Sequence, residues 1–288
     1  MLATTLTRLP LFPVPTGFTQ LDEDMVTPME PGWSQLIIGR VGVGKTTHLG
    51  IRAAAAAAST AEARPHATVL MLSTDDVSGH NAVRDAAERL AAGASDRLRL
   101  ASATTLAELA DAVYRTVQSA CTEAAAAGVP LAEAAPVVVC IDDADHLDIG
   151  LSRRSLGRAL RSLRTLDPVA LDAACGTRHE DYFPGGFPAQ LVGHQILMLA
   201  TLGVTVDCET APSFASLEET REYSQFIAGL DGGQPVWDVQ PGDQPAPGWS
   251  CLIDRFELQH ASSIIALHPA LKAPDGSLEA QNDLLWAV

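Results

Sequence analysis

Apolar residues in the first half of the chain gather in short runs, and segments with helical patterns separate these runs. The run SQLIIG favours a strand, and the alanine-rich TTHLGIRAAAAAA that closely follows it is typical of a helix. Further apolar runs at 67–76, 97–103 and 135–148 predict strands, with apolar and charged residues at helical spacing between them. Strands that alternate with helices predict an α/β fold with a mostly parallel β-sheet and helices on both faces.

The second half of the chain has a weaker pattern. An arginine-rich segment at 150–167 predicts a helix, and residues 189–203 predict another helix that leads to a strand at 204–210. Residues 214–230 also have a helical pattern, while 261–269 predict a last strand. The pattern therefore predicts the elements of this half less clearly than those of the first half.

We expect one main domain. The length of 288 residues permits one large domain or two small ones, and the sequence has no internal repeat. We assign residues 1–14 to an N-terminal extension and residues 15–288 to a single domain. Two segments rich in proline and glycine, near 175–188 and 231–249, predict loop insertions in that domain.

Composition and charge exclude several classes of protein. A hydrophobic content of 47% is typical of a globular chain, and a net charge of −16 argues against a surface that binds nucleic acid or anionic lipid throughout. The net charge does not exclude a local basic channel that binds nucleic acid. The five cysteines form no C-x-x-C pair, which indicates reduced thiols in a cytoplasmic protein. No apolar run approaches eighteen residues, so we expect no association with a membrane.

The segment GRVGVGKTT at 39–47 matches the phosphate-binding pattern G-x-x-x-x-G-K-[ST]. In such a P-loop, backbone N–H groups approach phosphate oxygens, the lysine reaches the β- and γ-phosphates, and the hydroxyl binds Mg²⁺. The alternative is a flexible glycine-rich turn. The chain has only two lysines against seventeen arginines, so a lysine at the motif position favours the P-loop. We expect ATP and Mg²⁺ to bind at Gly39, Arg40, Val41, Gly42, Val43, Gly44, Lys45, Thr46 and Thr47.

Two pairs of aspartates follow predicted strands, and a parallel sheet brings such strand ends to one edge. Asp142 is expected to bind Mg²⁺ together with Thr46, although an aspartate at this place can also cap the next helix. Asp75, or else Asp76, is expected to polarise the water that attacks the γ-phosphate, the alternative being a helix cap or a turn. Together with Lys45, these three aspartates are the predicted catalytic groups.

An arginine stripe follows Asp142 in the sequence. Arg154, Arg158 and Arg161 lie at positions i, i+4 and i+7, which is one face of a helix. Such a stripe can follow the phosphate backbone of single-stranded DNA. The alternative is a solvated helix face that pairs with acidic neighbours in a chain as acidic as this one. The sequence leaves both interpretations open.

The segment PTGFTQLDEDMVTPMEPGWSQLIIGRVGVGKTTHL at 15–49 resembles the start of the RecA-like ATPase domain of DnaB-type replicative helicases and of their RadA and KaiC relatives. The similarity continues in order through VLMLSTDD, LRLASATTLAELADAVYRT and VVVCIDD, and again at LQHASSIIALHP. It implies a RecA-like P-loop NTPase fold and a ring-forming ATPase with its active site between subunits. It also implies that Lys45 and Thr46 contact phosphate and metal, and that Asp75 stands in the place of the catalytic glutamate.

Two departures from the family pattern leave the activity open. After VTVDCET we find no glutamine that could sense the γ-phosphate, and after Arg255 the only lysine or arginine is Lys272, so no arginine finger is evident there. The resemblance implies a helicase-like, magnesium-dependent ATPase that acts on DNA or on a DNA replication or repair assembly. Its implied partners are further copies of the chain, such as a hexameric ring, single-stranded DNA, and a protein that supplies the arginine finger. The alternative is a nucleotide-gated switch or scaffold of the KaiC or RadA type with slow or no hydrolysis.

Overall fold

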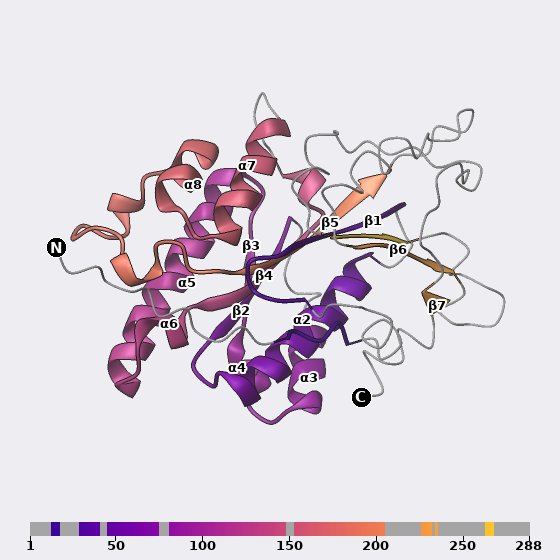
Figure 1. The fold of residues 1–288 in the computed structure, drawn as a ribbon, viewed down its shortest axis with the longest axis horizontal. Coiled ribbons are helices and arrows are strands. Elements are labelled where there is room, and N and C mark those ends of the chain that lie inside the picture. Colours follow the sequence, from indigo (N-terminus) through magenta and orange to yellow (C-terminus); the bar gives the residue numbers. More distant parts are fainter. Residues whose placement is uncertain are drawn as a thin grey trace.

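The described strands form one twisted sheet that runs through the middle of the molecule (Figure 1). A computed structural model describes residues 13–17, 29–40, 45–74, 81–147, 153–204, 226–231, 234–235 and 263–267. Within these residues the strand order is β3-β2-β4-β5-β1-β8-β6-β7, and neighbouring strands are parallel except for the antiparallel pair β6 and β7. The strands are β1 (Ser34–Arg40), β2 (Thr68–Ser73), β3 (Leu98–Ser102), β4 (Pro136–Asp142), β5 (Leu197–Val204), β6 (Phe226–Asp231), β7 (Gln234–Pro235) and β8 (Ser263–Leu267).

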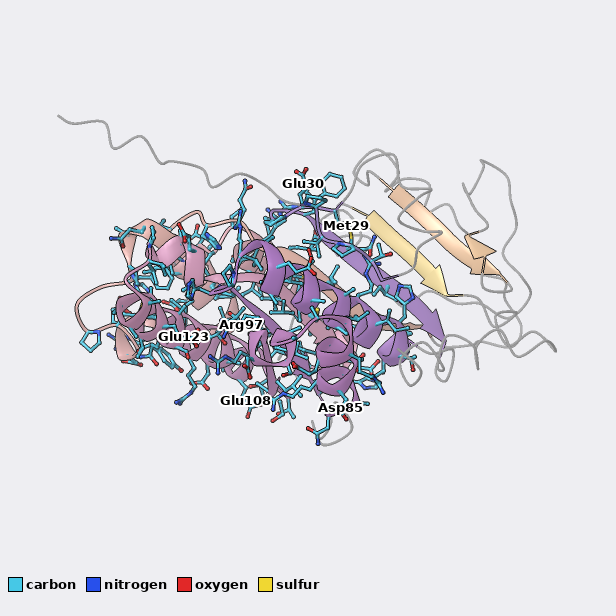
Figure 2. All side chains as sticks on the ribbon, turned by 90° about the horizontal axis from the view of Figure 1, so that it is seen from below. Met29, Glu30, Asp85, Arg97, Glu108 and Glu123 are labelled. Carbon is cyan, nitrogen blue, oxygen red and sulfur yellow. The ribbon has the colours of Figure 1, made fainter. Side chains whose placement is uncertain are left out.

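Helices cover both faces of this sheet, which confirms the α/β expectation (Figures 1 and 2). One layer contains α2 (Lys45–Ala63), α3 (Asn81–Leu90) and α4 (Ala94–Arg97). The other layer contains α5 (Leu106–Ala127), α6 (Leu131–Ala134), α7 (Arg153–Arg164) and α8 (Pro168–Cys175). Three short 3₁₀ helices are also described. η2 (Ala144–His146) follows β4, η3 (His179–Asp181) follows α8, and η4 (Ala189–Leu191) precedes β5. None of the described helices is long and apolar enough to cross a membrane.

Residues of the central strands alternate between the two helical layers. In β4, Val138 and Cys140 pack in the core beneath α2, whereas Val139 and Ile141 pack in the core beneath α5. β5 shows the same alternation, with its even-numbered residues toward α5. Because the sheet is buried on both faces, its strands read as continuous apolar runs rather than as an alternation of apolar and polar residues.

Two segments differ from the sequence-based expectation. Residues 197–204 form strand β5, so the helix expected over 189–203 was wrong for this part. β5 lies between β4 and β1, and a short strand buried on both faces has the same apolar pattern as a buried helix. Phe226–Asp231 forms strand β6 at the end of the helix expected over 214–230, because it pairs with β8 along its length. Val204, the first residue of the strand expected at 204–210, is the last residue of β5, while residues 205–210 and the other residues of 214–230 lie outside the described residues.

The outer edge of the sheet is tied to α5 by ion pairs. Glu123 of α5 pairs with Arg97, at 3.6 Å, and with Arg99 of β3 (Figure 2). The helix itself has well-formed ends. Thr105 accepts a hydrogen bond from the backbone N–H of Glu108, whose carboxylate in turn accepts one from the backbone N–H of Thr104.

The end of α5 provides a test of this backbone geometry. Gly128 follows the helix with φ of 66°, and an added Cβ would meet nothing within 4 Å. Because only backbone strain opposes a side chain there, Gly128→Ala is expected to lower the free energy of unfolding by about 1 kcal/mol. Gly185, which is equally open and lacks a positive φ, is the matched control, and Gly185→Ala should leave stability unchanged or slightly higher. Urea denaturation that gave the same loss for both variants would contradict the expectation.

Candidate functional site

The strand order brings the carboxyl ends of β1, β5 and β4 together. β5 pairs in parallel with both neighbours, with Gly39 opposite Gly203 on one side and Ile141 opposite Ala200 on the other. After β1, the next strand along the chain, β2, lies toward the β3 edge of the sheet. After β5, the chain continues to strands that lie beyond β1, toward the β7 edge. In open α/β sheets, ligands bind beyond the strand ends where the connections diverge in this way.

The two described ends of the predicted P-loop segment lie at this edge. Gly39 and Arg40 are the last residues of β1, and α2 begins at Lys45. Lys45 is buried although it carries a charged group, whereas Thr46 is exposed and Thr47 is half-buried. The start of a helix carries positive potential and attracts anions such as phosphate. Val41, Gly42, Val43 and Gly44, as well as Asp75 and Asp76, lie outside the described residues.

Asp142 is the last residue of β4 and lies on the face of the sheet toward α2, by the same alternation as Cys140. Only 3% of its surface is exposed. Its Oδ1 accepts a hydrogen bond of 2.7 Å from the hydroxyl of Thr201 in β5. A carboxylate in this place and a threonine hydroxyl from Thr46 are hard oxygen ligands of the kind that Mg²⁺ prefers.

Asp143 directly follows and makes a sharp turn. Its backbone has φ of 50° and ψ of 51°, a left-handed conformation that aspartate and asparagine adopt more easily than other non-glycine residues. Oδ1 of Asp143 lies 3.7 Å from Nζ of Lys45. The turn therefore presents one carboxylate to Lys45, while its neighbour Asp142 stays at the strand end.

Thr201 is the residue that sequence reasoning missed. It is fully buried, it donates to Asp142, and its oxygen accepts a hydrogen bond of 2.6 Å from the backbone N–H of Asp143. The expected helix over 189–203 concealed it, because a threonine in a helix would have no fixed relation to Asp142. A strand assignment for 197–204 would have revealed a polar residue near the end of a strand beside β4.

Burial also sets the protonation of two groups beneath the site. His48 in α2 is fully buried, and burial first and the charge of Arg52 second hold its pKa well below the ordinary value. Burial raises the pKa of the Cys140 thiol to about 12. Both groups are therefore uncharged near neutral pH.

The predicted arginine stripe lies on α7, as the sequence suggested. Arg154 is within the helix, and Arg158 and Arg161 are exposed on it. Arg164 is half-buried; burial, followed by the charge of Arg161, lowers its pKa. Two of the three predicted arginines are thus exposed on one helix.

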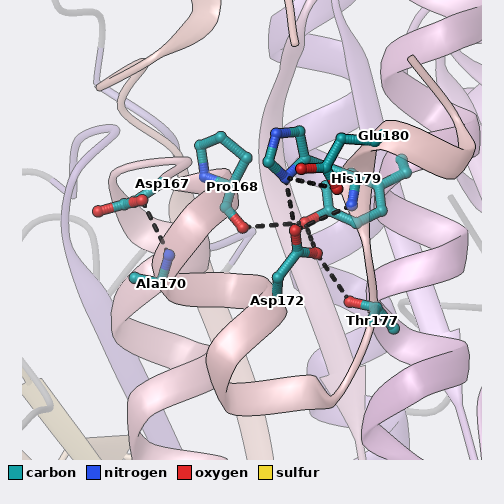
Figure 3. A network of polar contacts seen from close by, with 8 residues as sticks. Asp167, Pro168, Ala170, Asp172, Thr177, His179 and Glu180 are labelled. Atoms are coloured by element: carbon teal, nitrogen blue, oxygen red, sulfur yellow. Dashed lines mark hydrogen bonds and ion pairs between the residues drawn. The ribbon is translucent and has the colours of Figure 1, made fainter. Parts of the chain in front are cut away.

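A second group of potential metal ligands lies on α8 and η3. Oxygen or nitrogen atoms of Asp172, His179 and Glu180 all lie within 4.8 Å of one another (Figure 3). However, both carboxylate oxygens of Asp172 already accept hydrogen bonds, from Tyr114, Thr177 and His179. This group therefore acts as a hydrogen-bonded centre that joins α5, α8 and the following loop.

The edge formed by β1, β5 and β4 combines the groups that phosphate and a hard cation require. It has a buried lysine at a helix start, an exposed hydroxyl beside it, and two consecutive aspartates held by one threonine. No protein-family model matches the chain, and no curated protein sequence is significantly similar to it.

Proposed function

We propose that this protein is a magnesium-dependent ATPase of the RecA-like P-loop class, with its nucleotide site at the edge formed by β1, β5 and β4. One observation carries the proposal. Nζ of the buried Lys45 lies 3.7 Å from Asp143, directly after Asp142, although these residues come from distant parts of the sequence. The pairing joins a phosphate-binding cation to an acidic strand end at the point where open α/β sheets bind ligands.

Each residue has a distinct role in this proposal. Lys45 binds oxygens of the β- and γ-phosphates, and Thr46 and Asp142 hold Mg²⁺, which neutralises phosphate charge when bound. The oxygen of a water molecule attacks the γ-phosphorus, and the bond from this phosphorus to the β,γ-bridging oxygen breaks, giving ADP and phosphate. Asp75, with Asp76 as second choice, accepts the proton of that water. Both aspartates precede the described residues 81–147, and their role rests on the sequence alone.

The same proposal extends to DNA and to assembly. We propose a homo-oligomer, such as a hexameric ring, in which another subunit or a partner protein supplies an arginine finger. The exposed arginines of α7 are the surface that we assign to single-stranded DNA, because they lie at helical spacing on the first described α-helix after the turn at Asp143.

Salt-dependent binding tests the assignment of α7. The double variant Arg158→Ala, Arg161→Ala should bind single-stranded DNA more weakly, and its plot of log affinity against log salt should lose about 0.7 in slope for each phosphate contact removed. Arg115→Ala is the control, because Arg115 is an exposed arginine of a different helix, α5, where it pairs with Asp111. Fluorescence anisotropy at several salt concentrations measures all three proteins. An unchanged slope in the double variant would show that α7 is a solvated face.

Turnover of ATP by the wild-type protein tests the proposed function itself. Phosphate release is measured with Mg²⁺ or with EDTA, with and without single-stranded DNA, while light scattering follows the size of the assembly. Magnesium-dependent turnover that DNA stimulates supports the ATPase acting on DNA. Binding of ATP that changes the assembly without turnover supports the switch or scaffold instead. Absence of ATP binding at millimolar concentrations would overturn both.

A further inference from the structure

The hydroxyl of Thr201 connects the two aspartates of the site. It donates to Oδ1 of Asp142 at 2.7 Å and accepts from the backbone N–H of Asp143 at 2.6 Å. Thr201 has no exposed surface. A threonine hydroxyl has one hydrogen to donate, so the donation to Asp142 fixes the direction of the O–H bond and leaves the lone pairs for Asp143.

These two bonds act on different parts of the site. The bond to Oδ1 fixes the rotation of the Asp142 carboxylate, and hydrogen bonds of this kind to a ligating carboxylate tune metal affinity. The bond from the N–H of Asp143 holds the left-handed turn in which the Asp143 carboxylate lies 3.7 Å from Nζ of Lys45. One side chain therefore sets the orientation of both acidic groups.

We propose that Thr201 is a positioning residue that orients Asp142 for Mg²⁺ and Asp143 toward Lys45, and so gives the site its preference for magnesium-bound nucleotide over nucleotide alone. This inference rests on the proposed nucleotide site and adds a residue to it. Thr201 touches neither phosphate nor metal in this scheme. It acts through the two aspartates.

A purely structural threonine would behave differently. Thr116 in α5 is also buried, and its hydroxyl donates to the backbone carbonyl of Ala112 in the same helix. Replacement of either threonine by valine removes a hydroxyl while keeping nearly the same shape. Both variants are expected to lose some stability, but only the Thr201 variant should change the dependence of nucleotide binding on Mg²⁺.

Calorimetric titration with ADP tests this difference without relying on turnover. Wild type, Thr201→Val, Thr201→Ser and Thr116→Val are each titrated in Mg²⁺ and in EDTA. Thr201→Val should weaken binding about 10- to 100-fold in Mg²⁺ and change it less than about threefold in EDTA. Thr201→Ser, which keeps the hydroxyl, should stay within about threefold of wild type, and Thr116→Val should match wild type in both conditions.

The outcomes separate this inference from the proposed function. If wild type binds no nucleotide, the proposed function fails and this inference fails with it. If wild type prefers magnesium-bound nucleotide and Thr201→Val retains that preference, only the role of Thr201 is overturned. The role of Thr201 would also be overturned if Thr201→Val weakened ADP binding equally in Mg²⁺ and in EDTA, or if Thr201→Ser lost as much affinity as Thr201→Val. If circular dichroism shows that Thr201→Val does not fold, Thr201→Cys, with a weaker donor of similar size, takes its place.

Discussion

Replacement of Lys45 by alanine is expected to reduce the affinity for magnesium-bound ATP by at least about 100-fold while leaving the fold intact. Two effects lower the affinity of this variant for ATP. Hydrogen bonds from the ammonium group to phosphate oxygens disappear, and each such charge-assisted bond contributes about 1.5–3 kcal/mol. In addition, the carboxylate of Asp143, which lies 3.7 Å from Nζ of Lys45, would face the phosphates without that cation. Binding of a fluorescent ATP analogue measures the loss.

The matched control is Lys272→Ala, because Lys272 is the other lysine of the chain and belongs to no phosphate-binding pattern. It should bind ATP as wild type does. Lys45→Ala combined with Asp143→Asn should recover part of the lost affinity, since asparagine tolerates the left-handed turn and carries no charge. Affinity for ATP that remained within a factor of about three in Lys45→Ala would contradict the assignment of this segment as a P-loop.

The sequence predicted those parts of the site that depend on residues adjacent in the chain. Lys45 and Thr46 belong to a contiguous motif, and Asp142 ends an apolar run that is long enough to indicate a strand. The order of the strands is not a local property. It places β5 between β1 and β4, and only that order brings Thr201 against both aspartates.

The backbone conformation of Asp143 could not be predicted from the sequence pattern either. Its acidic character was evident, but the left-handed turn that directs its carboxylate to Lys45 depends on the bond from its backbone N–H to Thr201. The same reason explains the misassigned helix over 189–203. A buried strand and a buried helix share an apolar composition, and the neighbours in the sheet decide between them.

The second large expected effect concerns stability rather than binding, and it lies in the network of Figure 3. The carboxylate of Asp172 accepts hydrogen bonds from Tyr114 at 2.7 Å, from Thr177 at 2.9 Å, and from both the backbone N–H and Nδ1 of His179. Tyr114 is fully buried, and its ring packs against Tyr182 with centroids 5.1 Å apart. These bonds join α5 to α8 and to the loop that follows.

Asp172→Ala is therefore expected to lower the free energy of unfolding by about 2–4 kcal/mol, because it removes the acceptor of several buried or half-buried donors. Asp167 offers a comparison on the same helix. It caps the start of α8 by accepting a single bond from the N–H of Ala170, so Asp167→Ala should cost about 1 kcal/mol. Urea denaturation of both variants gives the two values. Equal losses would contradict the central role of Asp172.

The same network predicts a dependence of stability on pH. Burial alone would raise the pKa of Asp172, but hydrogen bonds from His179, Tyr114 and Thr177 together lower it below its ordinary value. A carboxyl whose pKa is lower in the folded protein stabilises the fold fully above its unfolded pKa of about 3.9 and loses this contribution as the pH falls through the folded value. Asp172→Asn, which cannot ionise, should therefore lose less stability than wild type when urea denaturation at pH 6 is compared with denaturation at pH 3. If both proteins lost the same amount between these two pH values, the ionised carboxylate would not be what holds α8 and the following loop against α5.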